Sequence, residues 1–273
     1  MSSARPALSP LAIASSAWRH RELIAQLTRR DIEARYKGSW LGVLWSLILP
    51  VGMLAVYTLV LSGFMKFRWP GANGTLEFSL VLFVGLIVFG FFAEVLGRAP
   101  GIVVGNPNYV KKVVFPLEVL PWIAVLSALF TALIGWLVWI AFAWALYGQV
   151  HWQIVYFPIV LASTIPLALG LGWAVGSLSV FVRDIPPLIG VVTQALLFLS
   201  PVFYATESVP KELRLIIQAN PLTRVIDQAR ATMVFGQSPD WAALGVQFTI
   251  SLLIGYLGFV CFQLTREAFA DVL

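Results

Sequence analysis

The sequence predicts an all-α integral membrane protein with six transmembrane helices. Of its 273 residues, 59% are apolar and only 11% are charged, whereas roughly 25% are charged in an average soluble domain. A soluble chain of this size cannot hide so much apolar surface from water. Several apolar stretches also reach about 20 residues, the length that a helix needs to cross a bilayer. Lipid is therefore the expected solvent.

Six stretches meet this length criterion. Residues 40–64 carry no charge, and Glu94 is the only acidic residue in the second stretch. Residues 119–182 contain no Asp, Glu, Lys or Arg, which is long enough for two helices separated near residues 147–151. The predicted spans are residues 40–64, 78–98, 119–147, 153–181, 185–206 and 241–265, and residues 266–273 form a tail.

Positive charge is distributed unevenly about these spans. Twelve Lys and Arg residues fall on the side that holds both termini, seven of them before the first span, and six fall on the other side. Because basic loops stay on the cytoplasmic side of a membrane, both termini are expected in the cytoplasm. No basic segment followed by an apolar one opens the chain through Ala14, so no cleaved signal peptide is expected.

The N-terminal segment, residues 1–39, contains a predicted amphipathic helix. Within residues 19–37, apolar side chains recur at helical spacing among charges, and Arg29 and Glu33 stand at an i,i+4 distance that favours an ion pair. A basic amphipathic helix directly before a span is expected to lie in the plane of the membrane surface. A solvated helix beside the membrane is the alternative.

Two further short amphipathic helices are predicted between the fifth and sixth spans, on the outer side. Asn220-Pro221 breaks the segment in two, since a proline favours a helix start and not a helix interior. The apolar faces are Leu213, Ile216 and Ile217 in the first helix, and Val225, Ile226, Ala229 and Met233 in the second. Such helices are expected to dip back toward the outer leaflet.

Residue patterns for catalysis or metal binding are missing from the sequence. None of the five lysines follows a glycine, so there is no phosphate-binding Gly-Lys-Ser/Thr loop. Cys261 is the single cysteine, and His20 and His151 stand apart from each other. We therefore expect no catalytic residue, no metal site and no cofactor bound by this chain. Its net charge of +5 is explained by membrane orientation and not by nucleic acid.

Ionisable groups inside the spans are scarce. Glu94 lies near the end of the second span with Arg98 one helical turn later, so the two side chains can neutralise each other. Ion-coupled transporters usually place several such groups at mid-membrane. The scarcity argues against an ion-driven carrier, although Glu94 keeps an ion-coupled secondary transporter of a small amphiphile open as an alternative.

The connection from Gly97 to Glu118 stands out among the cytoplasmic loops. Asn106 is placed to cap a short helix that has Pro107 at its first position, and Pro116 ends it. The helix combines Tyr, Val and Phe with two lysines, which suits a docking element for a soluble partner better than a mere connector.

Aromatic residues make up 14% of the chain, including eleven tryptophans. Those at span ends fit the interfacial belt of membrane proteins. Those deeper in the spans fit ordinary packing or lipid contact when taken singly. As a set they also fit a path for sugar rings, whose C–H faces stack on aromatic rings while the polar edges bond hydroxyls.

These segments together resemble the permeases of the ABC-type polysaccharide exporters, which move O-antigen, capsular polysaccharide or teichoic acid. The resemblance covers residues 20–265. It is carried by TRRDIEARYKGSWLGVLWS at 28–46, NPNYVKKVVFP at 106–116, VRD at 182–184, LSPVFY at 199–204, VP at 209–210 and NPL at 220–222.

The resemblance implies a homodimer in the bacterial cytoplasmic membrane, with two copies of a separate ATPase subunit that binds ATP and Mg²⁺. The substrate would be a lipid-linked polysaccharide that crosses between the two permeases. The implied coupling residues are Asn106, Tyr109, Lys111, Lys112, Phe115, Pro116, Arg183 and Asp184. The implied cytoplasmic gate, which would hold a lipid pyrophosphate, is Arg35, Tyr36 and Lys37. The expected channel lining is Trp45, Tyr57, Phe89, Phe92, Phe203 and Tyr204.

A membrane enzyme is the remaining alternative. It predicts a cluster of catalytic residues facing the membrane interface, and the sequence contains none that we recognise.

Overall fold

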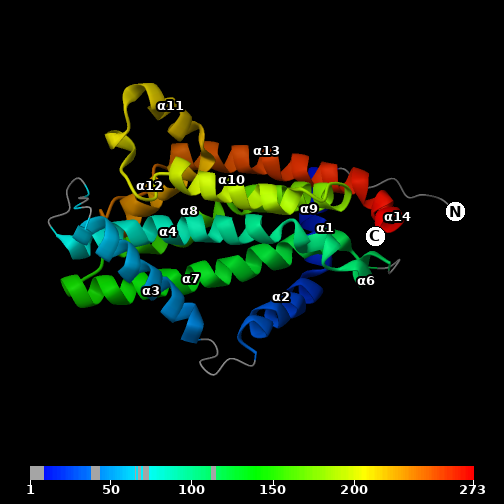
Figure 1. The fold of residues 1–273 in the computed structure, drawn as a ribbon, viewed down its shortest axis with the longest axis horizontal. Coiled ribbons are helices and arrows are strands. Elements are labelled where there is room, and N and C mark those ends of the chain that lie inside the picture. The colour runs from blue at the N-terminus through cyan, green and yellow to red at the C-terminus, as the bar shows by residue number, and fades with distance from the viewer. Residues whose placement is uncertain (1–8, 38–43, 65, 67–68, 70–73, 112–114) are drawn as a thin grey trace.

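The computed structural model describes residues 9–37, 44–64, 66, 69, 74–111 and 115–273, and every regular element within them is a helix (Figure 1). The predicted all-α class is therefore confirmed for the described chain. The elements are α1 Pro10–Arg19, α2 Arg21–Tyr36, α3 Trp45–Tyr57, η2 Thr58–Phe64, α4 Thr75–Arg98, α5 Gly101–Val104, α6 Pro107–Val110, η3 Leu117–Val119, α7 Leu120–Tyr147, η4 Trp152–Tyr156, α8 Phe157–Ala162, α9 Ile165–Phe181, α10 Ile185–Leu199, η5 Thr206–Ser208, α11 Lys211–Ala219, α12 Pro221–Met233, α13 Trp241–Thr265, η6 Arg266–Ala268 and α14 Phe269–Val272.

Four helical stretches in the described part of the chain are long and apolar enough to cross a membrane. They are Leu76–Arg98, Leu117–Tyr147, Trp152–Phe181 and Trp241–Val272. They coincide with the second, third, fourth and sixth predicted spans. The protein is thus a multi-span membrane protein by the length and composition of its helices.

The first and fifth predicted spans coincide with shorter apolar helices, Ile48–Phe64 and Ile185–Leu199. Helix α10 ends at Leu199 because Ser200 precedes a proline, and the residue before a proline is forced out of the helical region. Its 15 residues span about 22 Å at 1.5 Å per residue, less than the roughly 30 Å hydrocarbon core. The start predicted for the first span, residues 40–43, lies outside the described residues.

Helix α4 forms the centre of the bundle and contacts α7, α9, α10, α12 and α3. Its side chains include many of the buried core residues, among them Leu80, Val84 and Phe92. Figure 1 shows α4 and α7 side by side along the long axis, with α9, α10 and α13 on the opposite flank. A uniformly apolar helix of this kind suits a position surrounded by protein and lipid.

Helices α9 and α13 approach each other unusually closely, and glycines allow it. A Cβ atom at Gly258 would stand 2.0 Å from the carbonyl oxygen of Gly170, and one at Gly255 would stand 2.7 Å from that of Pro166. Small residues at a helix contact let two backbones approach, which is the common way to join helices in lipid. The short distance between α9 and α13 therefore depends on glycines at the contact, where any larger residue would push the two helices apart.

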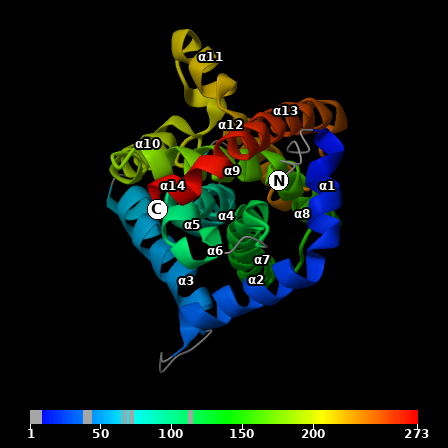
Figure 2. The ribbon, with the colours of Figure 1, turned by 90° about the vertical axis from the view of Figure 1, so that its right-hand side faces the viewer.

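The N-terminal amphipathic helix is present, but the segment differs from the prediction. The structure has α2 at Arg21–Tyr36 and a separate helix α1 before it, divided at His20. The sequence did carry a signal for α1, since Pro10 occupies its first turn. Figure 2, which looks along the bundle, shows α1 and α2 running around its outside, across the direction of the long helices.

The two helices between the fifth and sixth spans are also present, and their apolar faces differ in burial. In α12, the predicted apolar face of Val225, Ile226, Ala229 and Met233 is buried against the bundle. In α11, Ile217 is buried, but Leu213 and Ile216 are 53% and 59% exposed. Figure 1 shows α11 projecting from the bundle. The bundle thus covers the apolar face of α12 and leaves most of the apolar face of α11 uncovered within this single chain. The expected approach of both helices to the outer leaflet stays a prediction.

Arg230 on α12 is the most deeply buried charge among the described residues, at 2% exposure. Its guanidinium donates hydrogen bonds to the carbonyl oxygens of Val81 (3.2 Å), Pro201 (2.6 Å) and Val202 (2.7 Å). Burial lowers the pKa of Arg230 to about 10, so the group stays charged at neutral pH. This one side chain joins α12 to α4 and to the turn after α10.

Candidate functional site

An apolar groove lies among α3, α4, α7 and α10. It encloses a cavity of about 290 Å³ whose lining includes Tyr57, Phe83, Phe89 and Leu197. Tyr57 and Phe89 were predicted to line a channel, and the fold brings them to the same cavity from two helices. A groove with aromatic faces on both sides can hold the flat apolar face of a ring or an acyl chain.

The other predicted channel residues lie at varied places. The rings of Tyr57 and Phe203 are 5.3 Å apart, so these two join one aromatic cluster. The Tyr204 hydroxyl donates a hydrogen bond to the carbonyl oxygen of Phe198 at 2.9 Å. Phe92 is buried in the core at 4% exposure, whereas Trp45 is 38% exposed. The channel-lining role of these residues stays a prediction.

An ion-pair network joins α2 to α4. Arg98 of α4 donates a hydrogen bond to Asp31 of α2 at 2.6 Å, and Arg35 of α2 pairs with Glu94 of α4. Arg35 also lies 3.4 Å from Asp31, and Ser127 of α7 donates to Asp31 at 2.7 Å. Three helices that meet at one point are held together by these partly buried charges.

This network changes the interpretation of Glu94 and Arg98. The predicted contact between them exists at 3.8 Å, but each side chain has a closer partner on α2. Glu94 is therefore engaged with two arginines and forms part of a structural network. That arrangement does not favour Glu94 as the proton-binding group of an ion-coupled transporter.

The network also sets the charge of Asp31. Burial alone would raise its pKa, but hydrogen bonds from Arg98 and Ser127 and the charges of Arg98 and Arg35 outweigh burial and lower the pKa below its usual value. Asp31 is thus ionised at neutral pH and holds its two arginines in place. The sequence analysis did not single out Asp31 or Ser127, because their pairing depends on helices that are far apart in the chain.

A second cavity of about 500 Å³ separates α2 from the segment of α5 and α6. Its lining includes Arg30, Asp31, Arg98, Asn106 and Tyr109. The ion-pair network therefore forms one wall, and the predicted coupling segment forms the other.

The predicted coupling helix is shorter than expected. Helix α6 begins at Pro107 as predicted but ends at Val110. Asn106 does not cap it, since its side-chain amide turns back and donates to the carbonyl oxygen of Ile102 at 3.0 Å. The predicted cap is wrong, because the end of α5 supplies a competing acceptor.

Tyr109 and Phe115 contact each other across the predicted coupling segment. Their rings stack with centroids 4.2 Å apart and planes 6° from parallel. Lys111 is exposed and Pro116 is half-buried, while Lys112 lies outside the described residues. We call this stacked pair, with the exposed Lys111 beside it, the elbow, and its role in docking a soluble protein stays a prediction.

The remaining predicted site residues lie at the surface. Arg183 and Asp184 are exposed in the turn between α9 and α10, and the ring of the preceding Phe181 contacts Phe269 of α14 at 6.0 Å. Lys37 is exposed at the end of α2, and Tyr36 is half-buried. Their predicted roles in coupling and in a lipid head-group gate stay predictions.

Glu118 is a further residue that the sequence analysis missed. Its carboxylate accepts a hydrogen bond from Ser16 of α1 at 3.2 Å and lies 3.5 Å from Arg266, after α13. Its backbone carbonyl accepts from the Trp173 indole of α9 at 3.1 Å. Glu118 therefore connects the end of the coupling segment to α1, α9 and the end of α13.

The bundle of long apolar helices, with α1, α2 and the elbow at its surface, defines a multi-span membrane protein. Its helices enclose the two cavities described above. Comparison with known families identifies its class. The sequence profile of the ABC-2 type transporter family matches residues 22–234. This chain belongs to the ABC-2 type transporter family.

Full-length relatives are similar to the chain over nearly its whole length. The O-antigen export system permease protein RfbA of Myxococcus xanthus is 26% identical over 93% of this chain and 96% of its own. A protein of the same name from Klebsiella pneumoniae is 23% identical over 92% of this chain and 95% of its own. The polysialic acid transport protein KpsM of Escherichia coli is 23% identical over 90% of this chain and 94% of its own.

Proposed function

We propose that this chain is the transmembrane subunit of an ATP-driven exporter that moves a lipid-linked polysaccharide, of the O-antigen or capsular kind, across the bacterial cytoplasmic membrane. The observation that carries the proposal is the likeness of at least 90% of the chain to two differently named kinds of polysaccharide export protein. Energy would come from a separate ATPase subunit, since the sequence holds no Gly-Lys-Ser/Thr loop.

The proposed assembly contains two copies of this chain and two copies of the ATPase. Each chain would cross the membrane six times, with α3 and α10 as the two short spans and both termini in the cytoplasm. The groove among α3, α4, α7 and α10 would then form half of the translocation path. A helix as short as α10 does not match the thickness of the hydrocarbon core. Packing against a second copy of the chain would cover its exposed apolar side chains, so α10 suits an interface between two copies.

The proposed transmission path runs from the Tyr109–Phe115 elbow to the ion-pair network. Motion of the ATPase would displace α6, which is joined to α5 by the hydrogen bond from Asn106. Helix α5 packs against α7, whose Ser127 donates to Asp31 of the network. Rigid elements joined by packed contacts are the physical means by which such coupling travels.

The test is to purify the chain together with its candidate ATPase subunit. We expect a complex of two permeases and two ATPases whose ATP hydrolysis rises when the permease is bound. Replacing both Tyr109 and Phe115 with alanine should remove most of that stimulation while the chain still inserts. Phe248→Ala, at an exposed ring on α13, serves as the control. Failure to form the complex would contradict the proposal.

A further inference from the structure

The cavity of about 500 Å³ between α2 and the segment of α5 and α6 lies where two long apolar helices end. The stretch Leu76–Arg98 finishes at Arg98, and Leu120 is near the start of Leu117–Tyr147. Both of these residues line the cavity. Figure 2 looks onto this end of the bundle and shows α2 running beside α7. The cavity is therefore at the depth of the lipid head groups, which flank the hydrocarbon core.

One face of α2 forms a wall of this cavity. The residues that it contributes are spaced about one helical turn apart, and they are Leu27, Arg30, Asp31 and Ala34. Asp31 is already paired, because it accepts a hydrogen bond from Arg98 at 2.6 Å and lies 3.4 Å from Arg35. Arg30 is exposed and makes no ion pair or hydrogen bond with a residue that the structure describes. An anion beside Arg30 would therefore gain an ion pair without breaking one.

The opposite wall supplies hydrogen-bond donors. Tyr109 is half-buried, and its hydroxyl has no hydrogen-bond partner within the described chain. Asn106 uses one N–H of its side-chain amide on the carbonyl oxygen of Ile102, and such an amide carries two N–H donors. Unused donors thus stand on both sides of the cavity. They suit a ligand that presents several acceptor oxygens to Arg30 and Tyr109 together.

The charge and the apolar part of the lining restrict the ligand further. Counted over the described residues, the lining holds two arginines and one aspartate, so cations exceed anions by one. A phosphate group provides both the negative charge and the acceptor oxygens. Ile102, Leu120 and Ile123 also line the cavity, and a free phosphate would leave these side chains in water. The glycerol and first methylenes of a lipid would cover them. Basic pockets between membrane helices are a known form of anionic lipid site.

We propose that this cavity binds the phosphate head group of an anionic phospholipid of the membrane. The phosphate would pair with Arg30 and accept hydrogen bonds from Tyr109 and Asn106, while the acyl chains follow the apolar wall into the bilayer. The head group would then bridge α2 and the elbow, the two sides that the cavity separates. The inference needs a chain that spans a membrane and does not depend on what the chain exports.

The test is native mass spectrometry of the full chain in a neutral detergent, titrated with phosphatidylglycerol. We expect the first phosphatidylglycerol to bind more tightly than diacylglycerol with the same acyl chains, which lacks the phosphate. Arg30→Gln should weaken that binding by about fivefold to tenfold, the loss of one charged hydrogen-bond partner. Arg29→Gln is the matched control. Arg29 is the neighbouring exposed arginine, it lies outside the lining, and it pairs with Glu33. Its loss should leave the affinity for the first lipid unchanged.

Tyr109→Phe isolates the hydroxyl, because the stacking on Phe115 is kept. It should weaken the binding of phosphatidylglycerol by about threefold. Inorganic phosphate and farnesyl pyrophosphate, added as competitors, distinguish a phospholipid from other phosphate compounds, and neither should displace phosphatidylglycerol at equal concentration.

Four results would overturn the inference. They are equal affinity for phosphatidylglycerol and diacylglycerol, unchanged affinity in the Arg30→Gln or Tyr109→Phe variant, equal weakening by Arg29→Gln, and displacement by either competitor at equal concentration. Each of them concerns lipid binding by the chain alone. The complex with the ATPase is measured separately, so failure of this inference and failure of the proposed function are distinguishable.

Discussion

Replacing Arg230 with methionine tests how much of the fold depends on one buried cation. Methionine fills a similar volume but donates nothing, so the carbonyl oxygens of Val81, Pro201 and Val202 lose the hydrogen bonds that they now accept from the guanidinium. Each buried acceptor without a partner costs about 1–3 kcal/mol. The cost of burying the cation disappears at the same time, which offsets part of the loss. We expect a net destabilisation of about 3–5 kcal/mol, because the loss of these hydrogen bonds outweighs that offset.

The assay is thermal unfolding in detergent, followed by tryptophan fluorescence. For a chain of this length, 3–5 kcal/mol corresponds to a fall in apparent melting temperature of about 6 °C or more. Arg224→Met is the matched control, because Arg224 lies on the same helix and is exposed. An unchanged melting temperature in the Arg230→Met variant, or an equal fall in both variants, would refute the reasoning.

Three further predictions concern packing and charge. Gly85→Ala would place a Cβ atom 2.8 Å from the Arg230 guanidinium and should destabilise the protein by about 1–3 kcal/mol in thermal unfolding. Gly90→Ala on the same helix meets open space and should be neutral or slightly stabilising. Gly258→Ala should separate α9 from α13 and lower the melting temperature clearly more than Gly245→Ala, where nothing lies within 4 Å. Asp31→Asn should lower stability at pH 7, and the difference from the unmodified chain should begin to shrink as the pH falls below about 4, the unfolded pKa. A lowered carboxyl pKa contributes stability that is complete above the unfolded value and is lost as the pH falls through the folded value. A difference that stays constant as the pH falls from 7 to 3 would contradict the ion-pair assignment.

The helices themselves followed largely from local sequence. Long uncharged stretches predicted the four long spans, and Asn220-Pro221 correctly divided α11 from α12. Apolar spacing predicted the apolar faces of both helices. The fold covers only the face of α12, because a stripe shows that a helix has an apolar face and not that a neighbour reaches it.

The candidate sites were only partly predictable. The helix start at Pro107 followed from residue type and spacing, and Tyr57 and Phe89, singled out as aromatics, line one cavity. Asp31, Glu118 and Arg230 were missed, since each is paired with a residue far away in the sequence, and residue type alone made them look like surface charges.

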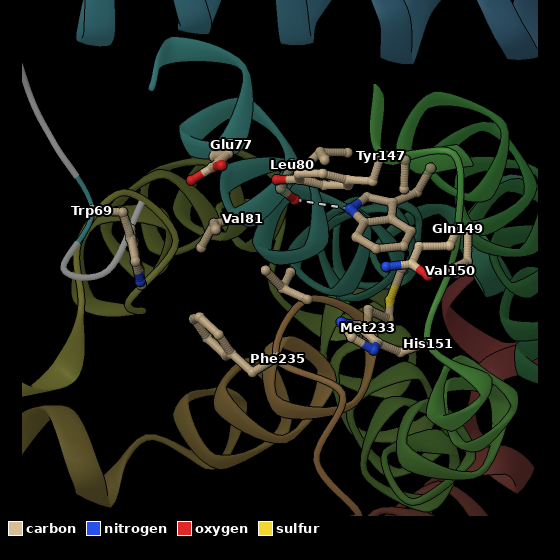
Figure 3. Close-up of a pocket in the computed structure, with 13 residues that line it drawn as sticks. Trp69, Glu77, Leu80, Val81, Tyr147, Gln149, Val150, His151, Met233 and Phe235 are labelled. Atoms are coloured by element: carbon tan, nitrogen blue, oxygen red, sulfur yellow. Dashed lines mark hydrogen bonds between the residues drawn. The ribbon is translucent and has the colours of Figure 1, made fainter. Parts of the chain in front are cut away.

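Hydrophobic length and local motifs are properties of neighbouring residues, so the sequence alone predicts a helical membrane protein that is similar to the polysaccharide export permeases. Which charges lie in the protein interior depends on how distant helices pack. Arg230 and Asp31 differ little from other ionisable residues in the sequence, and only the fold supplies the carbonyl oxygens and guanidinium groups that make their burial favourable. The cavity at the start of α4 and the end of α7 has the same origin, since Trp69, Trp139 and His151 line it only after three segments of the chain meet (Figure 3).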